Sequence, residues 1–305
     1  MKRILLLGGN GFLGRNLAKV LNDSDTFEVS VYDFLQASER ISGVDYYMGS
    51  IEDTNYICSI IKKKNINVLV HLVSTIIPGS SLDQYINNCK LVQISTISLM
   101  DYCASNHIEF VYLSSGGTVY GVKGGVISEN EPVAPISYYG LSKVQIEDLI
   151  NFYHRRYNLN YLILRPSNPY GFGQNLYGKQ GLIAVIIGKI LSKESIVVFG
   201  DGTTIRDYIY IDDFAFYVKE LVGKSIINET INIGSGIGYS INQILEVVKK
   251  VVCNDIKISY ISARKDDVPK IVLDTTRLHN FVPHNDTPIE KGIKQFYEKV
   301  MCNQW

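Results

Sequence analysis

The sequence predicts an α/β protein built on a doubly wound parallel sheet, with a smaller α/β lobe toward the C-terminus. The first observation is a series of short runs rich in Ile, Val, Leu and Tyr, which are typical of buried parallel strands. The second is that longer amphipathic stretches separate these runs, as crossover helices do. We expect strands at 3–7, 28–32, 67–72, 109–113 and 160–164, and helices at 12–22, 52–64, 84–106 and 137–157.

This alternation loosens after Pro166, where a connector rich in Gly and Tyr covers residues 168–181. Beyond it we expect helices at 182–192, 212–223 and 240–253, and strands at 195–199, 230–233 and 256–261. These segments do not continue a simple count of strand and helix, so they are divided between the sheet and a second layer. The expected first domain is 1–165 with 194–230 returning to it, and the expected second lobe is 166–193 with 231–305.

The composition is that of an ordinary globular protein, with 46% hydrophobic and 20% charged residues. Thirty basic residues balance 30 acidic ones, so no net charge favours nucleic acid or an anionic membrane as a partner. The apolar stretch from Ile4 to Leu7 ends at a glycine and is too short for a signal peptide or a membrane span. We therefore expect a cytoplasmic protein without nucleic-acid or membrane partners.

The cysteines and histidines lack the spacing of metal ligands. The five cysteines contain no CxxC pair, and an odd, scattered set is typical of core thiols in a reducing compartment. His107, His154, His279 and His284 share no ligand spacing with one another or with a cysteine. We therefore predict no metal site.

A glycine-rich turn follows the first expected strand directly and leads into the first helix. Its glycines stand at positions 8, 11 and 14, a spacing that permits a tight turn, close approach of backbone to a pyrophosphate, and packing of helix on strand. The N-terminus of the helix then faces the phosphate charge. The turn predicts a Rossmann-type dinucleotide site formed by Gly8, Asn10, Gly11, Phe12, Leu13 and Gly14.

Asp33 ends the second expected strand, about 20 residues after the glycine turn. A carboxylate there accepts hydrogen bonds from both ribose hydroxyls and repels a 2′-phosphate, which favours NAD over NADP. NADP stays open as a cofactor, since a basic residue such as Arg40 could compensate. The alternative interpretation is structural: the glycines make only a tight turn, and Asp33 caps the next element.

Tyr139 and Lys143 stand four residues apart at the start of an expected helix, so their side chains project to one side. A phenol with its reference pKa of ~10 is a poor acid–base group at neutral pH. A neighbouring ammonium and a positive nicotinamide stabilise the phenolate and lower that pKa. This spacing is a common accident in a chain with 21 tyrosines, so the prediction of hydride chemistry depends on the glycine turn upstream.

Across nearly its whole length the chain resembles the extended short-chain dehydrogenase/reductase family, in particular its nucleotide-sugar 4-epimerases and 4-ketoreductases. The resemblance rests on GGNGFLG at 8–14, SSGGTVYG at 114–121, YYGLSK at 138–143, LRPSNPYG at 164–171, GDGTTIRDYIYIDD at 200–213, NIGSG at 232–236 and RKDDVP at 264–269. It implies a nucleotide-sugar substrate bound by the second lobe, catalysis by Tyr139 with Lys143 as its partner and cofactor ligand, and a homodimer.

The family places a Ser or Thr in the loop after the fifth strand, against the sugar hydroxyl that reacts. Here that position is Gly116. We expect Thr118 to supply the hydroxyl, with Ser115 or backbone contacts as the alternatives.

The same resemblance implies further binding residues. Arg206 and Arg264 are expected to grip the diphosphate as bidentate donors, and Asn168 to contact the substrate near it. Ser50 and Ile51 stand where relatives cover the adenine with an acidic and an apolar residue.

Two reactions at C4 of the hexose fit the resemblance. A 4-epimerase must retain its NAD through two half-reactions, and this chain departs from the family at cofactor positions such as Ser50 and in the loop at Gly116. By a small margin we therefore expect reduction of a dTDP-4-keto-6-deoxyhexose, in the synthesis of sugars for surface polysaccharide. The alternative is a UDP-hexose 4-epimerase of the UDP-glucose/UDP-galactose type, and a third interpretation is a non-catalytic module that binds NAD or a sugar nucleotide.

Overall fold

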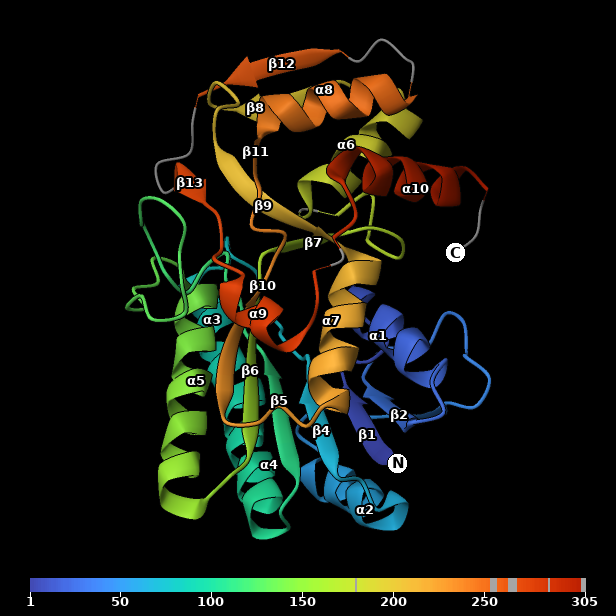
Figure 1. The fold of residues 1–305 in the computed structure, drawn as a ribbon, viewed down its shortest axis with the longest axis vertical. Helices are drawn as coiled ribbons and strands as arrows, with labels where there is room; N and C mark the ends of the chain where they lie inside the picture. The colour runs from blue at the N-terminus through green and yellow to red at the C-terminus, as the bar shows by residue number, and fades with distance from the viewer. Residues whose placement is uncertain (179, 253–256, 263–267, 285, 303–305) are drawn as a thin grey trace. The chain divides into compact units, whose positions relative to one another are not determined.

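A computed structural model describes residues 1–178, 180–252, 257–262, 268–284 and 286–302 (Figure 1). The chain divides into two compact units. Unit 1 contains Met1–Tyr120, Pro132–Arg165 and Ala215–Ile231, and unit 2 contains Gly121–Glu131, Pro166–Phe214 and Asn232–Trp305. The chain therefore passes repeatedly from one unit to the other.

A seven-stranded sheet forms the centre of unit 1, in the strand order β10-β6-β5-β4-β1-β2-β3. Its strands are β1 Lys2–Leu7, β2 Phe27–Asp33, β3 Asp45–Met48, β4 Val68–His71, β5 Glu109–Leu113, β6 Tyr161–Pro166 and β10 Glu229–Ile233. All neighbours from β3 to β6 pair in parallel. The order reverses between β1 and β4, which confirms the predicted doubly wound sheet and places the ligand edge at the carboxyl ends of its strands.

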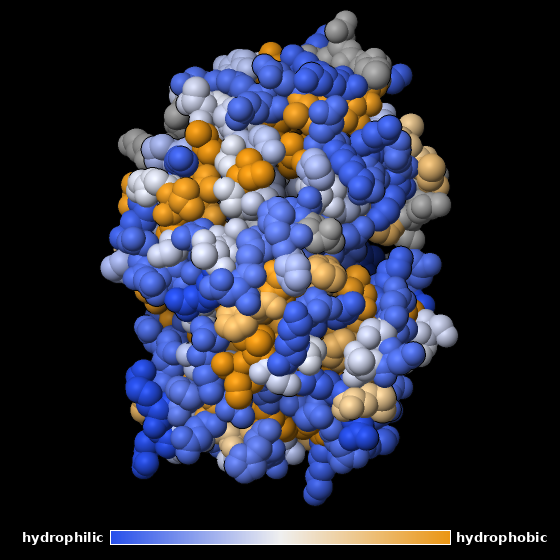
Figure 2. All heavy atoms as spheres, in the orientation of Figure 1, coloured by the Kyte–Doolittle hydropathy of each residue, from blue (hydrophilic) through white to orange (hydrophobic). Residues whose placement is uncertain are grey.

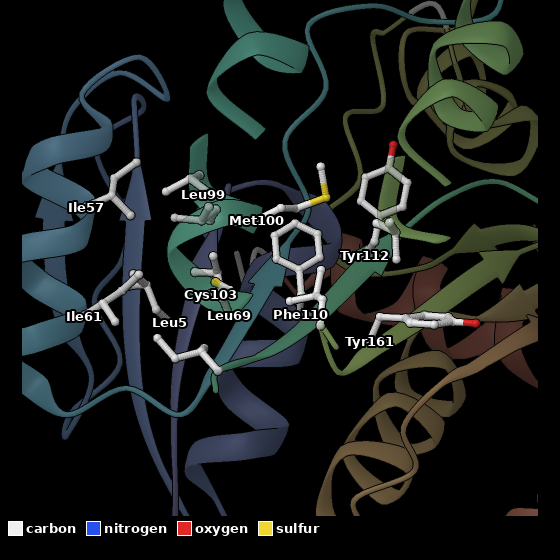
Figure 3. Close-up of a cluster of buried hydrophobic side chains, with 14 of the residues drawn as sticks. Leu5, Ile57, Ile61, Leu69, Leu99, Met100, Cys103, Phe110, Tyr112 and Tyr161 are labelled. Atoms are coloured by element: carbon white, nitrogen blue, oxygen red, sulfur yellow. The ribbon is translucent and has the colours of Figure 1, made fainter. Parts of the chain in front are cut away.

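Helices cover both faces of this sheet (Figure 1). One face carries α2 Thr54–Lys64, α4 Ile94–Ser105 and α5 Tyr138–Tyr157, and the other carries α1 Phe12–Asn22 and most of α7 Ile211–Gly223. Under the first group of helices, Phe110 and Met100 belong to a large cluster of buried side chains (Figure 3). Leu6 and Val111, which point to the opposite face, are fully buried as well. Burial on both faces explains why these strands appear in the sequence as continuous apolar runs.

The single helix expected at 84–106 is instead three consecutive elements. The helix α3 Leu82–Asn88 is followed by a π-helical turn, η1 Cys89–Gln93, and then by α4. A capping box begins α3, in which the side chains of Ser81 and Gln84 each accept a hydrogen bond from the backbone N–H of the other. The π turn does not interrupt the apolar pattern, so the sequence does not predict it.

The described residues of unit 2 form two smaller sheets with helices around them. One sheet contains β7 Asn168–Tyr170, β9 Ile205–Tyr210, β11 Gly238–Ser240 and β13 Lys270–Ile271, and the other pairs β8 Ile196–Phe199 with β12 Ile258–Ile261. The helices are α6 Leu182–Leu191, α8 Ile241–Val252, α9 Thr276–Phe281 and α10 Ile289–Met301. The sequence pattern does not predict β3 of unit 1 or, in unit 2, β7, β9, β11, β13, α9 and α10.

The boundary between the units differs from the expected one in two places. Residues 194–214 belong to unit 2 and not to the first domain, because β8 pairs with β12 and β9 pairs with β11 and β13. The chain rejoins unit 1 only at Ala215, inside α7. Residues 121–131 also belong to unit 2, where Ile127 N–H donates to Val272 O at 2.9 Å.

Among the described residues, every helix is too short or too polar to cross a bilayer. On the face shown in Figure 2, hydrophobic residues are interspersed with hydrophilic ones. Scattered apolar residues of this kind are normal on a protein surface and indicate no particular partner.

Candidate active site

The glycine turn lies between β1 and α1, at the carboxyl edge of the unit 1 sheet. Gly8 has a φ of +80°, a conformation that favours glycine. A Cβ on Gly14 would lie 2.5 Å from Gly9 Cα, whereas a Cβ on Gly11 would meet Gly8 O at 3.4 Å. Among the described residues no side chain caps α1, so its first backbone N–H groups are available to an anion. The turn can therefore hold a phosphate group against the helix.

Asp33 ends β2 beside this turn. Its carboxylate accepts hydrogen bonds from Asn10 N–H and Leu35 N–H, both at 2.8 Å, and the residue is 9% exposed. Asn10 Nδ2 donates to Leu35 O at 2.6 Å and closes the arrangement. A carboxylate has about four lone-pair sites, so the fixed side chain can still accept from ribose hydroxyls.

The other predicted cofactor residues lie at the same edge of the sheet. Gly49 N–H donates to the backbone carbonyl of Asp33 at 3.1 Å, so Ser50 and Ile51 follow β3 at the edge where Asp33 ends β2. Phe12 and Leu13 are half-buried in the first turn of α1. The predicted cofactor residues therefore come from adjoining parts of unit 1.

The helix α5 presents Tyr139 and Lys143 from its first two turns, and Ser137 caps it by accepting from Gly140 N–H at 3.1 Å. Lys143 is 4% exposed, and its Nζ donates to Leu113 O at 2.8 Å and lies 5.5 Å from the centre of the Tyr139 ring. Burial lowers the pKa of the Lys143 ammonium to about 8 and raises the pKa of the Tyr139 phenol to about 12. At neutral pH the pair is thus a cation beside a neutral phenol.

Ser115, rather than Thr118, lies beside the phenol. Burial has the larger effect on the pKa of Tyr139, and a hydrogen bond with the Ser115 side chain lowers that pKa. Thr118 Oγ1 is buried, and within the described part of the chain it has no hydrogen-bond partner. The Thr118 carbonyl packs on α5, where a Cβ on Gly140 would approach it to 2.6 Å. Because protein covers the Thr118 hydroxyl in this conformation, we prefer the alternative, Ser115, as the hydroxyl partner of Tyr139.

A buried ion pair holds α5 in place, and it is not among the residues predicted from the sequence. Glu147, one turn after Lys143, accepts from Arg165 Nη2 at 2.5 Å and from Arg165 Nε at 3.1 Å. The two side chains are 5% and 8% exposed. Arg165 Nη1 also donates to Tyr120 Oη at 2.9 Å, and Ser114 Oγ donates to Glu147 Oε1. A glutamate four residues after the lysine, and an arginine ending a buried strand, are the sequence signals that could have identified the pair.

His71 ends β4 and is fully buried. Its Nε2 lies 2.9 Å from Thr96 Oγ1, and its ring centre lies 5.7 Å from that of Tyr112. Burial, with a smaller effect from the charge of Lys143, lowers the pKa of His71 to about 3, so the imidazole is neutral.

Three predicted substrate residues belong to unit 2, and two of them, Asn168 and Arg206, lie within the described residues. Asn168 Nδ2 donates to Asp207 O at 2.8 Å, which ties β7 to β9. Arg206, also on β9, donates from Nη1 to Val268 O at 2.7 Å and to Ile205 O at 2.9 Å. Asn168 and Arg206 thus stand on adjoining strands of one sheet. Arg264 lies outside the described residues.

Comparison with known proteins gives the family. Residues 4–234 match the model of the NAD dependent epimerase/dehydratase family. This chain belongs to that family. The match confirms the predicted membership of the extended short-chain dehydrogenase/reductases, the class of nucleotide-sugar epimerases and oxidoreductases, and NAD as the cofactor.

Similar proteins cover nearly the whole chain. A UDP-glucose 4-epimerase from Thermotoga maritima, solved with UDP-glucose, is 30% identical, with a TM-score of 0.92 and coverage of 99% of this chain and 100% of that one. A dTDP-4-dehydro-6-deoxyglucose reductase from Escherichia coli is 29% identical over 98% of both chains. A UDP-glucose 4-epimerase from Lactobacillus helveticus is 29% identical over 90% of this chain and 89% of its own.

The residues of unit 1 fit NAD. The bare backbone at Gly11 and the uncapped N-terminus of α1 suit the pyrophosphate, and the fixed carboxylate of Asp33 suits the ribose. Arg40, which could have accommodated a 2′-phosphate, places its guanidinium 5.5 Å from the Tyr46 ring centre. Use of NADP therefore has little support here and stays a prediction.

The glycine turn has two roles, packing of α1 on the turn and binding of the pyrophosphate, and Gly14→Ala and Gly11→Ala test them separately. In Gly14→Ala the new methyl group meets the backbone of Gly9, so we expect a loss of about 1–3 kcal/mol in the free energy of unfolding of NAD-free protein. Gly11→Ala has room for the methyl group and should keep its stability, but it should bind NAD at least about tenfold more weakly, because the pyrophosphate approaches that backbone. Urea unfolding and calorimetric NAD titration measure the two effects. Wild-type NAD affinity in Gly11→Ala would contradict the assignment.

Proposed function

We propose that this chain transfers hydride at C4 of a nucleoside-diphosphate hexose, with Tyr139 as the acid–base group. The observation that carries the proposal is the group formed by Tyr139, Lys143 and Ser115 at the ligand edge of the sheet. Lys143 is only 4% exposed, and burying its ammonium reduces the free energy of unfolding, as the lowered pKa of Lys143 indicates. As a cofactor ligand Lys143 would serve a binding module as well, so the phenol and the Ser115 hydroxyl placed beside it are what argue for catalysis.

The residues of unit 1 divide the acid–base work among them. When bound, NAD supplies the acceptor for the hydride that leaves C4. Tyr139 accepts the proton of the C4 hydroxyl in the oxidation and returns a proton in the reduction. Lys143 stabilises the phenolate by its charge, and Ser115 stabilises it by donating a hydrogen bond.

The residues of unit 2 bind the remainder of the substrate in this proposal. Arg206 and Arg264 pair with the two phosphates, since a guanidinium matches phosphate oxygens with parallel donors. Asn168 contacts the substrate near them. Nη1 of Arg206 donates to two backbone carbonyl oxygens, and these bonds fix the direction of the guanidinium.

Between the two reactions we favour 4-epimerisation of a UDP-hexose, which reverses the small preference drawn from the sequence. The support is the 30% identity to the Thermotoga maritima UDP-glucose 4-epimerase, over 99% of this chain, together with the Lactobacillus helveticus enzyme. UDP-glucose and UDP-galactose are then the expected pair of sugars.

Reduction of a dTDP-4-keto-6-deoxyhexose by NADH is the second candidate. It is supported by the 29% identity to the Escherichia coli reductase over 98% of both chains. Ser50 favours it too, because it departs from the family at an adenine position, where a 4-epimerase must retain its NAD. The homodimer and the role in polysaccharide synthesis stay predictions under either reaction.

Tyr139→Phe removes the acid–base group and keeps the ring. We expect the turnover number to fall by about 10²–10⁴ while NAD binding persists, because the lost hydroxyl acts in proton transfer. Ser115→Ala should lower turnover as well, and Thr118→Val serves as its matched control with little change. Near wild-type turnover in Tyr139→Phe would overturn the proposed role, and a larger loss in Thr118→Val than in Ser115→Ala would restore Thr118 as the hydroxyl partner.

A paired assay decides between the two reactions. In one arm the NAD-loaded protein receives UDP-glucose without added cofactor, and UDP-galactose is measured by chromatography. In the other arm the protein receives NADH and a dTDP-4-keto-6-deoxyhexose, and absorbance at 340 nm is followed. A 4-epimerase converts sugar in the first arm, whereas a reductase consumes one NADH per sugar in the second. Bound NAD without turnover in either arm would support a binding module.

A further inference from the structure

Two histidines and an aspartate of unit 2 lie close together where α9 ends and the segment leading to α10 begins. His279 lies in the last turn of α9, and His284 and Asp286 follow it. One nitrogen of each ring and one carboxylate oxygen all lie within 4.8 Å of one another. The spacing of these residues in the sequence matches no known ligand pattern and predicts no metal site, but the fold supplies a proximity that spacing does not reveal.

Two short contacts bring the ring nitrogens and the carboxylate oxygen together. His279 Nε2 lies 3.0 Å from His284 Nδ1, which lies 3.3 Å from Asp286 Oδ2. The two rings meet edge to face, with centres 4.6 Å apart and planes at 68°, so they are not stacked on each other. For comparison, ligands at ~2.0–2.2 Å from a tetrahedral ion are roughly 3.4 Å apart.

His279 also has the outer contact that is typical of metal-bound histidine. Its Nδ1 lies 3.4 Å from Val282 O, which can accept only from a protonated nitrogen. A proton on Nδ1 leaves the lone pair on Nε2, the nitrogen that faces His284 and Asp286. Ligating histidines commonly fix their tautomer in this way, through a carbonyl on the second ring nitrogen.

The carboxylate of the group is buried, and the residue after it is anchored. The Asp286 side chain is 8% exposed, whereas His284 is 62% exposed. The next residue, Thr287, donates from its N–H and its hydroxyl to the Asp213 carboxylate, at 2.7 Å and 2.9 Å. The buried half of the group is thus anchored, and the exposed histidine leaves a route for an ion from solvent.

We propose that His279, His284 and Asp286 bind one divalent transition-metal ion of the zinc, cobalt and nickel class. Two imidazole nitrogens and one carboxylate oxygen suit these ions, whereas calcium and magnesium take oxygen ligands. Three protein ligands leave a fourth position for water. The ion links the end of α9 to the segment that begins α10, so its role is to stabilise unit 2, and it takes no part in hydride transfer.

The test is metal binding to tag-free, chelator-treated protein in which Cys302→Ser removes an exposed thiol. We expect one equivalent of cobalt or zinc, measured by visible absorption and by equilibrium dialysis, and a rise in melting temperature on adding zinc. His284→Asn should weaken binding at least about tenfold and abolish the rise. His107→Asn is the matched control, because His107 is exposed, lies outside the group and has a φ of +54° that asparagine tolerates.

Two outcomes overturn the proposal. Equal affinity in His284→Asn and His107→Asn would show that the ion binds elsewhere. Absence of stoichiometric binding in the wild-type background would show that the three residues form a hydrogen-bonded chain only. Because His284 is exposed, its substitution should leave the fold intact, which circular dichroism checks.

Discussion

The proposed active site depends on the buried ion pair between Glu147 and Arg165. It joins α5 to the end of β6, and Ser114 at the end of β5 hydrogen-bonds the same carboxylate. Removing one partner of such a pair leaves an uncompensated buried charge and costs ~3–5 kcal/mol, whereas an exposed pair contributes little. Lys143 and Tyr139 precede Glu147 by one and two turns on the same helix, so the ion pair determines where they stand.

This placement has an electrostatic consequence. Burial raises the pKa of Tyr139 to about 12, so at neutral pH the phenol of the protein alone keeps its proton and is unreactive. Burial also lowers the pKa of Lys143 to about 8, yet the ammonium keeps its charge at neutral pH because Glu147 opposes that effect. In the proposed mechanism Tyr139 therefore becomes effective as an acid–base group only when further positive charge or hydrogen bonding stabilises its phenolate.

The sequence predicts unit 1 well and unit 2 poorly, for a physical reason. Strands buried on both faces have an unmistakable apolar pattern, and glycines at 8, 11 and 14 have few other uses. Strands such as β11 and β13 have three and two residues, too few for any period to appear.

Side-chain groups that the fold assembles leave only weak signals in the sequence. Arg165 meets Glu147 across 18 positions, and the group at His279 depends on the turn after α9. Ser115 and Thr118 lie in one loop, and only the packing of that loop on α5 distinguishes their hydroxyls.

The pH dependence of the turnover number in Glu147→Gln tests the role of the ion pair most directly. The Glu147 carboxylate raises the pKa of Lys143 against the larger effect of burial. Without that carboxylate the ammonium loses its proton at a lower pH, so the alkaline limb of the profile should move to lower pH while NAD still binds. Glu109→Gln, which removes a buried carboxylate paired with Lys2, should leave the limb in place. An alkaline limb unchanged in Glu147→Gln would contradict the account.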